Sequence, residues 1–84
     1  MYRVTITRPA DKDLKNLDRQ IKNRIVSEIL SLAAEPRPHG CRKVVSEDRL
    51  WRVRVGDWRI GYEIDESARE ITIIRVGHRR EFYE

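Results

Sequence analysis

The run from Leu50 to Tyr62 predicts a β-hairpin, and it constrains the fold of this 84-residue chain more than any other segment. Two stretches rich in Val, Ile and aromatic residues flank Gly56-Asp57, and glycine at the first central position suits a two-residue type II′ turn. Such a short turn sets the pairing of the strands that it joins. Val55 is therefore expected to face Trp58, and the pairing continues back along both strands.

This register sorts the hairpin side chains onto two faces. One face is apolar and carries Trp51, Val53, Val55, Trp58, Ile60 and Tyr62. On the other face Arg54 lies across from Arg59, and Arg52 lies across from Gly61. Like charges placed opposite each other are destabilising, so the arrangement favours a phosphate or polyanion site. A solvated sheet face is the alternative interpretation of the same arginines.

Length and composition limit the domain organisation and the partners. The chain is long enough for one domain, residues 1–84, and too short for a second. Its single cysteine, Cys41, forms no internal disulfide, which favours the cytoplasm. No apolar run approaches the roughly 18 residues of a membrane span. A net charge of +4 indicates an anionic partner, either nucleic acid or an acidic protein.

The other elements follow from hydrophobic periodicity and from stop signals. The pattern predicts further strands at residues 2–7 and 71–77, a short strand starting at Val44-Val45, and helices that open at Pro9 and after Asp18 and stop at Pro36. This order is typical of an α+β fold, in which an N-terminal strand and a helical hairpin precede a three-stranded antiparallel meander. Both helices are expected to pack on one face of a single sheet.

The last predicted strand has apolar residues at both its odd and its even positions, so both of its faces carry apolar side chains. Ile71 and Ile73 alternate onto one side, whereas Ile74 and Val76 alternate onto the other. Part of this apolar surface is therefore expected to stay uncovered in the lone chain, which predicts a protein partner.

Further candidate site residues follow the last strand. Gly77 ends it, and antiparallel pairing is expected to bring His78, Arg79 and Arg80 close to the strand that begins near Arg59. Arg79 and Arg80 are otherwise a charged tail. Tyr83 is either a core anchor or a phenol that stacks on a nucleic-acid base.

No cofactor is expected from the motifs. His39 and Cys41 lie in one loop, but a metal site there would need at least two further ligands at suitable spacing, so both are interpreted as structural. Phosphate-binding and dinucleotide-binding glycine patterns are absent from the sequence, as are hydrolase signatures.

The hairpin from Leu50 to Ile64, together with the tail from Val76 to Tyr83, resembles the RelE toxins of the RelE/ParE superfamily, and the resemblance spans the whole chain. It implies a toxin that is paired with an antitoxin. RelE-like toxins enter the ribosomal A site and cut mRNA without a metal, whereas ParE-like relatives on the same fold poison DNA gyrase. The fold by itself does not decide between these activities.

The resemblance also implies roles for individual residues. Arg59 corresponds to the phosphate-binding arginine, Arg79 to the arginine that stabilises charge at the scissile phosphate, and Tyr83 to the tyrosine that stacks on the mRNA base. Arg52 and Arg54 stand where well-studied members carry lysines. Together with Arg80, these two arginines are expected to contact the RNA.

The exchange of lysine for arginine changes the expected chemistry. An arginine keeps its proton at physiological pH, so Arg54 stabilises charge and takes no proton from the substrate. His78 is the first candidate for the general base or acid, because histidine is the side chain that ordinarily changes charge near neutral pH. Glu63, on the Arg59 face, is the second. Groups of the substrate or of ribosomal RNA are a third source.

The sequence and its resemblance to RelE toxins thus predict a ribosome-dependent, metal-independent endoribonuclease, in which Arg54, Arg59 and Arg79 assist the attack of an RNA 2′-hydroxyl. The expected partners are the ribosome with its mRNA and a RelB-like antitoxin, an acidic amphipathic peptide that covers the hairpin arginines. Two alternatives remain open. One is a ParE-like gyrase inhibitor, and the other is an RNA- or ribosome-binding module without catalysis.

Overall fold

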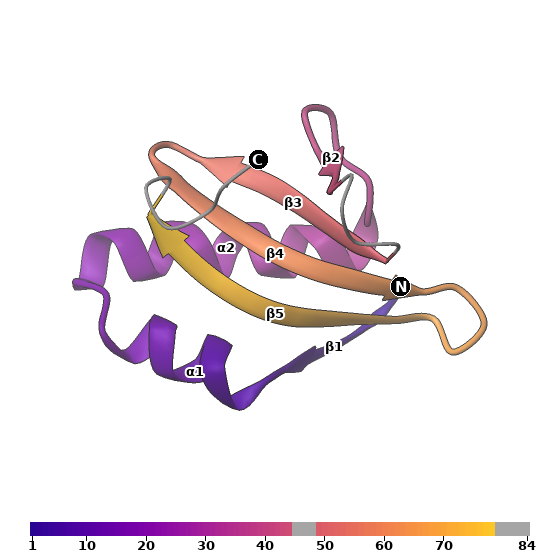
Figure 1. Ribbon diagram of the computed structural model, residues 1–84, viewed down its shortest axis with the longest axis horizontal. Helices are drawn as coiled ribbons and strands as arrows, with labels where there is room; N and C mark the ends of the chain where they lie inside the picture. Colours follow the sequence, from indigo (N-terminus) through magenta and orange to yellow (C-terminus); the bar gives the residue numbers. More distant parts are fainter. Residues whose placement is uncertain (45–48, 79–84) are drawn as a thin grey trace.

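The computed structural model describes residues 1–44 and 49–78. The elements run in the order β1 (Arg3–Ile6), α1 (Arg8–Lys15), α2 (Arg19–Ala34), β2 (Arg42–Lys43), β3 (Leu50–Val55), β4 (Trp58–Asp65) and β5 (Glu70–His78). One sheet contains all five strands in the order β1-β5-β4-β3-β2 (Figure 1). β1 is parallel to β5, and the other neighbours are antiparallel. The predicted α+β fold is confirmed.

The helices form on the signals present in the sequence. The Thr7 hydroxyl caps α1 by accepting from the Ala10 amide, so the helix begins one residue before Pro9. Asp18 caps α2 as predicted, since its carboxylate accepts from the Ile21 amide at 3.0 Å. α2 ends at Ala34, two residues before Pro36.

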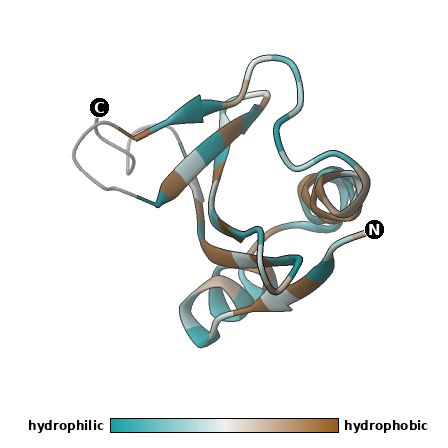
Figure 2. Ribbon diagram, turned by 90° about the vertical axis from the view of Figure 1, so that its right-hand side faces the viewer, coloured by the Kyte–Doolittle hydropathy of each residue, from teal (hydrophilic) through white to brown (hydrophobic). Residues whose placement is uncertain are grey.

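Both helices bury their apolar stripes on the same side of the sheet. Viewed nearly along its axis in Figure 2, α2 lies on one side of the curved strands. Side chains from α1, α2 and the three long strands form one core, in which Ile25, Leu32 and Ile60 are inaccessible to solvent. Tyr62 is equally buried, and its hydroxyl donates to the Pro36 carbonyl at 2.6 Å. This bond holds the end of α2 against the sheet.

The hairpin register is confirmed at each predicted pair, including Arg54 with Arg59 and Arg52 with Gly61. Gly56 has a φ of +61°, whereas Asp57 does not have a positive φ, which matches the predicted type II′ turn. The predicted short strand is displaced. It is formed by Arg42–Lys43, just before Val44, and Val45 lies outside the described residues.

A β-bulge in β5 corrects the prediction of an uncovered apolar strand. Gly61 pairs with Arg75 and Tyr62 pairs with Ile73, so Ile74 is an extra residue without a partner on β4. The extra residue shifts the side-chain alternation by one. Ile73 and Val76 therefore both point into the core, with exposed fractions of 0% and 3%. Apolar residues before and after the bulge are therefore buried on the same side, and the expectation that β5 presents an uncovered apolar face is wrong.

The start of α1 and the far end of β5 are joined by polar contacts. β1 ends at Ile6, its last paired residue, and α1 then runs beside β5 (Figure 1). Thr7 donates its amide to the Ile73 carbonyl and its hydroxyl to the Ile74 carbonyl. Asp13 accepts from the Val76 amide at 2.9 Å. The helix thus satisfies backbone groups that the short β1 leaves without a strand neighbour.

Candidate functional site

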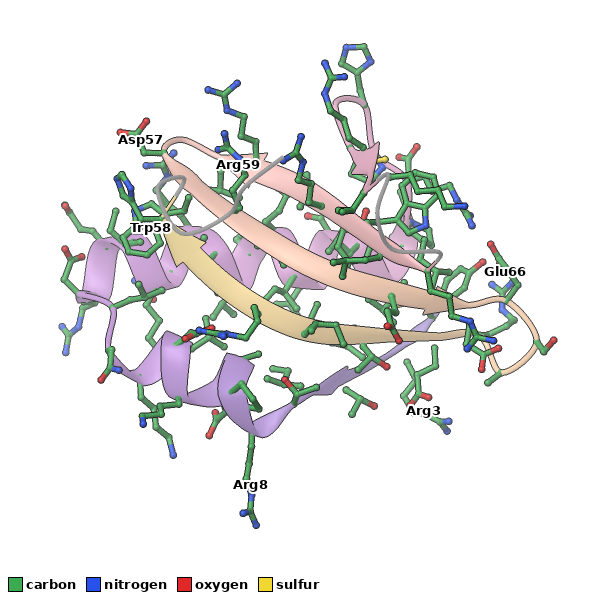
Figure 3. The ribbon with its side chains drawn as sticks, in the orientation of Figure 1. Arg3, Arg8, Asp57, Trp58, Arg59 and Glu66 are labelled. Atoms are coloured by element: carbon green, nitrogen blue, oxygen red, sulfur yellow. The ribbon has the colours of Figure 1, made fainter. Side chains whose placement is uncertain are left out.

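Four arginines gather on the side of the sheet opposite the core. Arg42 pairs with Arg52 across β2 and β3, and Arg54 pairs with Arg59 across β3 and β4. Together with Gly40, these four residues, hereafter the arginine cluster, line a hollow of about 100 Å³. Figure 3 shows nitrogen-rich side chains around Arg59 near the hairpin end of β4. The register set by the Gly56 turn places three of these arginines on β3 and β4, and the pairing of β2 with β3 adds the fourth.

The electrostatics of the arginine cluster favour an anionic ligand. Burial lowers the pKa of the Arg52 guanidinium, and repulsion by Arg59 and Arg42 lowers it further. The Nη1 atom of Arg59 is shielded from solvent, whereas Arg54 is exposed. No carboxylate from the described ranges lines the hollow. A phosphate bound there would relieve the mutual repulsion and accept several charge-assisted hydrogen bonds.

Arg42 is a site residue that was not predicted from the sequence. The short strand was predicted to start two residues later, which left Arg42 in a loop without a defined neighbour. In the structure, the backbone turns at Gly40, whose φ is +91°, and Arg42 then lies directly across from Arg52. Arg42 and the residues that follow it do not alternate between polar and apolar side chains, so the sequence shows no strand there. Only the pairing of Arg42 with β3 reveals that it belongs to the site.

The structure does not bring His78 to the arginine cluster. His78 pairs with Trp58, and their rings meet edge to face with centroids 5.5 Å apart. Trp58 belongs to the core side of the hairpin, so the register places His78 on that side as well, while Gly77 faces Arg59. Glu63 does share the face of Arg59, but it pairs with Leu50, beyond the pair of Gly61 with Arg52.

Three predicted site residues, Arg79, Arg80 and Tyr83, lie outside the described residues. Their predicted roles at the scissile phosphate and the RNA base therefore stay predictions.

Neither a metal centre nor a membrane segment is found in the part of the chain that the structure describes. Groups of three or more His, Cys, Asp or Glu side chains suited to hold a metal ion do not occur among residues 1–44 and 49–78. Within the same ranges, neither helix is long and apolar enough to cross a membrane. Cys41 has a free thiol and is half-buried.

Comparison with known proteins identifies the family. Residues 4–83 match the family model described as the ParE toxin of type II toxin-antitoxin systems, parDE. The chain belongs to this toxin family. Curated proteins gave no match to it.

Solved structures place this toxin in the wider RelE/ParE superfamily. It is similar to a chain of the RelBE2 toxin-antitoxin complex from Mycobacterium tuberculosis, with 29% identity, a TM-score of 0.83, and 92% and 96% of the two chains covered. The archaeal RelE-RelB complex from Pyrococcus horikoshii gives 28% identity, a TM-score of 0.81, and 93% and 94% coverage. The intact E. coli RelBE complex, at 15% identity, a TM-score of 0.82, and 93% and 96% coverage, shares the fold.

Proposed function

We propose that this toxin is a ribosome-dependent endoribonuclease that cleaves mRNA in the A site and so inhibits translation. The observation that carries the proposal is the arginine cluster, which places four guanidinium groups around one hollow opposite the core. Guanidinium groups bind phosphate oxygens with bidentate geometry, and they stay charged throughout a reaction. The similarity to RelE chains at 28% and 29% identity supports the same branch of the superfamily.

In the proposed reaction, an RNA 2′-oxygen attacks the adjacent phosphorus in line with the leaving 5′-oxygen. The P–O5′ bond breaks, the 2′-hydroxyl proton is lost to a base, and the 5′-oxygen gains a proton. The products are a 2′,3′-cyclic phosphate and a 5′-hydroxyl. Arg54 and Arg59, with Arg79 from the tail, stabilise the negative charge that develops on the phosphate oxygens.

Proton transfer has a separate test, because the described geometry leaves His78 on the side of Trp58. If His78 is the general base or acid, the cleavage rate of the wild-type toxin changes with pH near neutrality, and this change is absent in His78→Ala. An unchanged profile assigns the proton to another group. Glu63→Gln then tests the carboxylate that shares the face of Arg59, by the loss of an acidic limb.

The experiment that tests the proposal is primer extension on mRNA held in programmed 70S ribosomes, with naked RNA as a control. We expect cleavage within the A-site codon by the wild-type toxin and its loss in Arg59→Ala. Arg3→Ala is the matched control, since Arg3 lies on β1, away from the arginine cluster, with a largely exposed side chain. Intact mRNA with a folded wild-type toxin would refute the proposal. Binding to ribosomes without cleavage would favour a non-catalytic RNA-binding module.

Inhibition of DNA gyrase is the second candidate function, and the match to the ParE family model favours it. In that case the arginine cluster contacts gyrase or its DNA and performs no chemistry. Gyrase-dependent breakage of supercoiled plasmid, with ribosome-bound mRNA left intact, would replace the first proposal by this one.

We also propose a RelB-like antitoxin as a partner. The RelB and RelE chains of the archaeal relative form a complex, and an acidic amphipathic peptide would complement the net charge of +4 here. Leu30 on α2, 64% exposed, and Ile6 on β1, 41% exposed, offer apolar contacts. Co-expression with the neighbouring gene should yield a complex that lacks toxicity. Isolation of a fully toxic monomer from that co-expression would contradict this proposal.

A further inference from the structure

A second basic surface lies between α1 and β5. An open hollow of about 650 Å³ is lined there by Arg8, Pro9, Asp11, Lys12, Asp13, Lys15, Asn16 and Arg75. The four cations and two carboxylates in this lining leave an excess of positive charge. Pro9 is the only residue of this lining that has an apolar side chain.

The ion pairs of this surface leave two cations uncompensated. Lys15 pairs with Asp11 at 3.1 Å, and Arg75 pairs with Asp13 at 2.8 Å. Across residues 1–44 and 49–78, no ion pair involves Arg8 or Lys12. Figure 3 shows Arg8 extending from α1 away from the sheet.

The position of Arg8 also runs against local helix electrostatics. It is the first residue of α1, where the helix dipole disfavours a cation. Arg8 therefore makes no evident contribution to the stability of the fold, because it has no ion-pair partner among the described residues and lies at the positive end of a helix. This combination favours a role in binding.

Arg75 connects this surface to the arginine cluster. It pairs with Gly61, which lies on the same face of β4 as Arg59. Arg59 itself pairs with Gly77, so Arg75 is its diagonal neighbour, at a Cα separation of about 7–8 Å. Cations therefore follow one another across β2, β3, β4, β5 and α1.

We propose that the arginine cluster, Arg75 and the α1 cations Arg8 and Lys12 form one track that binds the phosphate backbone of the RNA substrate on both sides of the cleaved bond. This inference deepens the proposed endoribonuclease function and rests on it. Three strand spacings of about 4.8 Å and roughly 10 Å to the helix give the track a length of about 24 Å. At the rise of about 3.4 Å per nucleotide of a stacked strand, it holds about seven nucleotides.

The lining favours RNA over an acidic peptide. A peptide helix that docks in a groove needs apolar anchors at helical spacing, and this lining supplies only Pro9. A row of cations that crosses successive strands matches the regular negative charge of a nucleic-acid backbone. The exposed apolar side chains Leu30 and Ile6 are absent from the lining, so an amphipathic antitoxin has its contacts elsewhere.

The test compares short and long RNA in a double variant, Arg8→Gln with Lys12→Gln. Fluorescein-labelled 2′-O-methyl oligouridine of three or eight nucleotides is the probe, because methylation removes the attacking hydroxyl. Each lost phosphate contact should reduce the slope of log K against log[salt] by about 0.7. Two contacts then lower the affinity for the eight-nucleotide RNA about 25-fold at 0.1 M KCl, by the same counterion-release relation. The Kd of the three-nucleotide RNA should stay within about twofold.

The matched control is Arg19→Gln with Lys22→Gln, which removes the same charge from exposed positions on α2, outside the track. Three outcomes would refute the proposed track. The test and control variants lose the same affinity, the test variant loses the same affinity for both RNA lengths, or the wild-type toxin binds no RNA. The two proposals fail separately. A 25-fold loss confined to the long RNA, with ribosomal mRNA left intact by the wild type, would refute only the endoribonuclease function.

Discussion

Replacement of Asp13 by alanine should destabilise the end of β5 that carries the neighbours of the arginine cluster. The Asp13 carboxylate accepts from the Val76 amide at 2.9 Å and from Arg75 Nε and Nη2 at 2.8 and 3.3 Å. The next β5 residue, Gly77, pairs with Arg59. Asp13 thus closes the sheet edge beside the strand that positions Arg59.

The two contacts of Asp13 differ in weight. A hydrogen bond from a backbone amide to a charged acceptor contributes about 1.5–3 kcal/mol. The Arg75 side chain is 58% exposed, so its ion pair with Asp13 adds only about 0–1 kcal/mol. We expect Asp13→Ala to lower the free energy of unfolding by about 2–3 kcal/mol. For a domain of this size that corresponds to a fall in Tm of roughly 10–20 °C.

Urea unfolding followed by circular dichroism measures the effect, and hydrogen exchange at the Val76 amide localises it. Arg75→Ala is the matched control, since it removes the ion pair and leaves the backbone bond; it should lose less than about 1 kcal/mol. Asp13→Asn keeps one oxygen acceptor, so its free energy of unfolding should lie between those of Asp13→Ala and Arg75→Ala. If Asp13→Ala is no less stable than Arg75→Ala, the reasoning that α1 supports the β5 backbone is refuted.

Three further predictions concern the scaffold. Tyr62→Phe should lower the free energy of unfolding by about 1–2 kcal/mol, because the Pro36 carbonyl loses its donor, and an unchanged urea midpoint would contradict this. Gly56→Ala should cost about 1 kcal/mol through its φ of +61°, as measured by thermal unfolding, whereas equal stability would argue against the type II′ turn. Hydrogen bonds, first from Tyr2 and then from Arg37, lower the pKa of the Glu66 carboxyl, so its stabilising contribution is present above its unfolded pKa and is lost as the pH falls through the folded pKa. Tyr2→Phe should raise that pKa in an NMR titration, and no change would exclude the hydrogen bond as the main cause.

The fold explains why a core on one side and charge on the other coexist in so small a sheet. The hairpin alternates apolar and arginine side chains, and the helices cover only the apolar side. Arg54 and Arg59 lie on the side that the helices leave uncovered, and the exposed Arg54 side chain reaches solvent, which screens part of the repulsion between them. The fold by itself does not decide the target of a toxin, so the site geometry and the assays decide the function.

Much of this arrangement could be predicted from the sequence because it depends on local chemistry. Gly56 selects the turn, the turn sets the hairpin register, and the register puts Arg52, Arg54 and Arg59 on one face. The N-cap at Asp18 and the stop near Pro36 are also local signals. Each of these features involves residues close in the chain, so no tertiary contact was needed to anticipate it.

Tertiary structure decided what local pattern leaves open. The parallel pairing of β1 with β5 joins residues that are far apart in the chain, such as Arg3 and Glu70. The bulge at Ile74 and the side on which His78 lies are set by the register of β5 against β4. A strand with apolar residues at both odd and even positions has two possible alternations. The core packing of Ile73 and Val76, together with the hydrogen bond that the Val76 amide donates to Asp13 on α1, selects the bulged one. Arg42 joins the arginine cluster for the same reason, since only its pairing with β3 brings it beside Arg52.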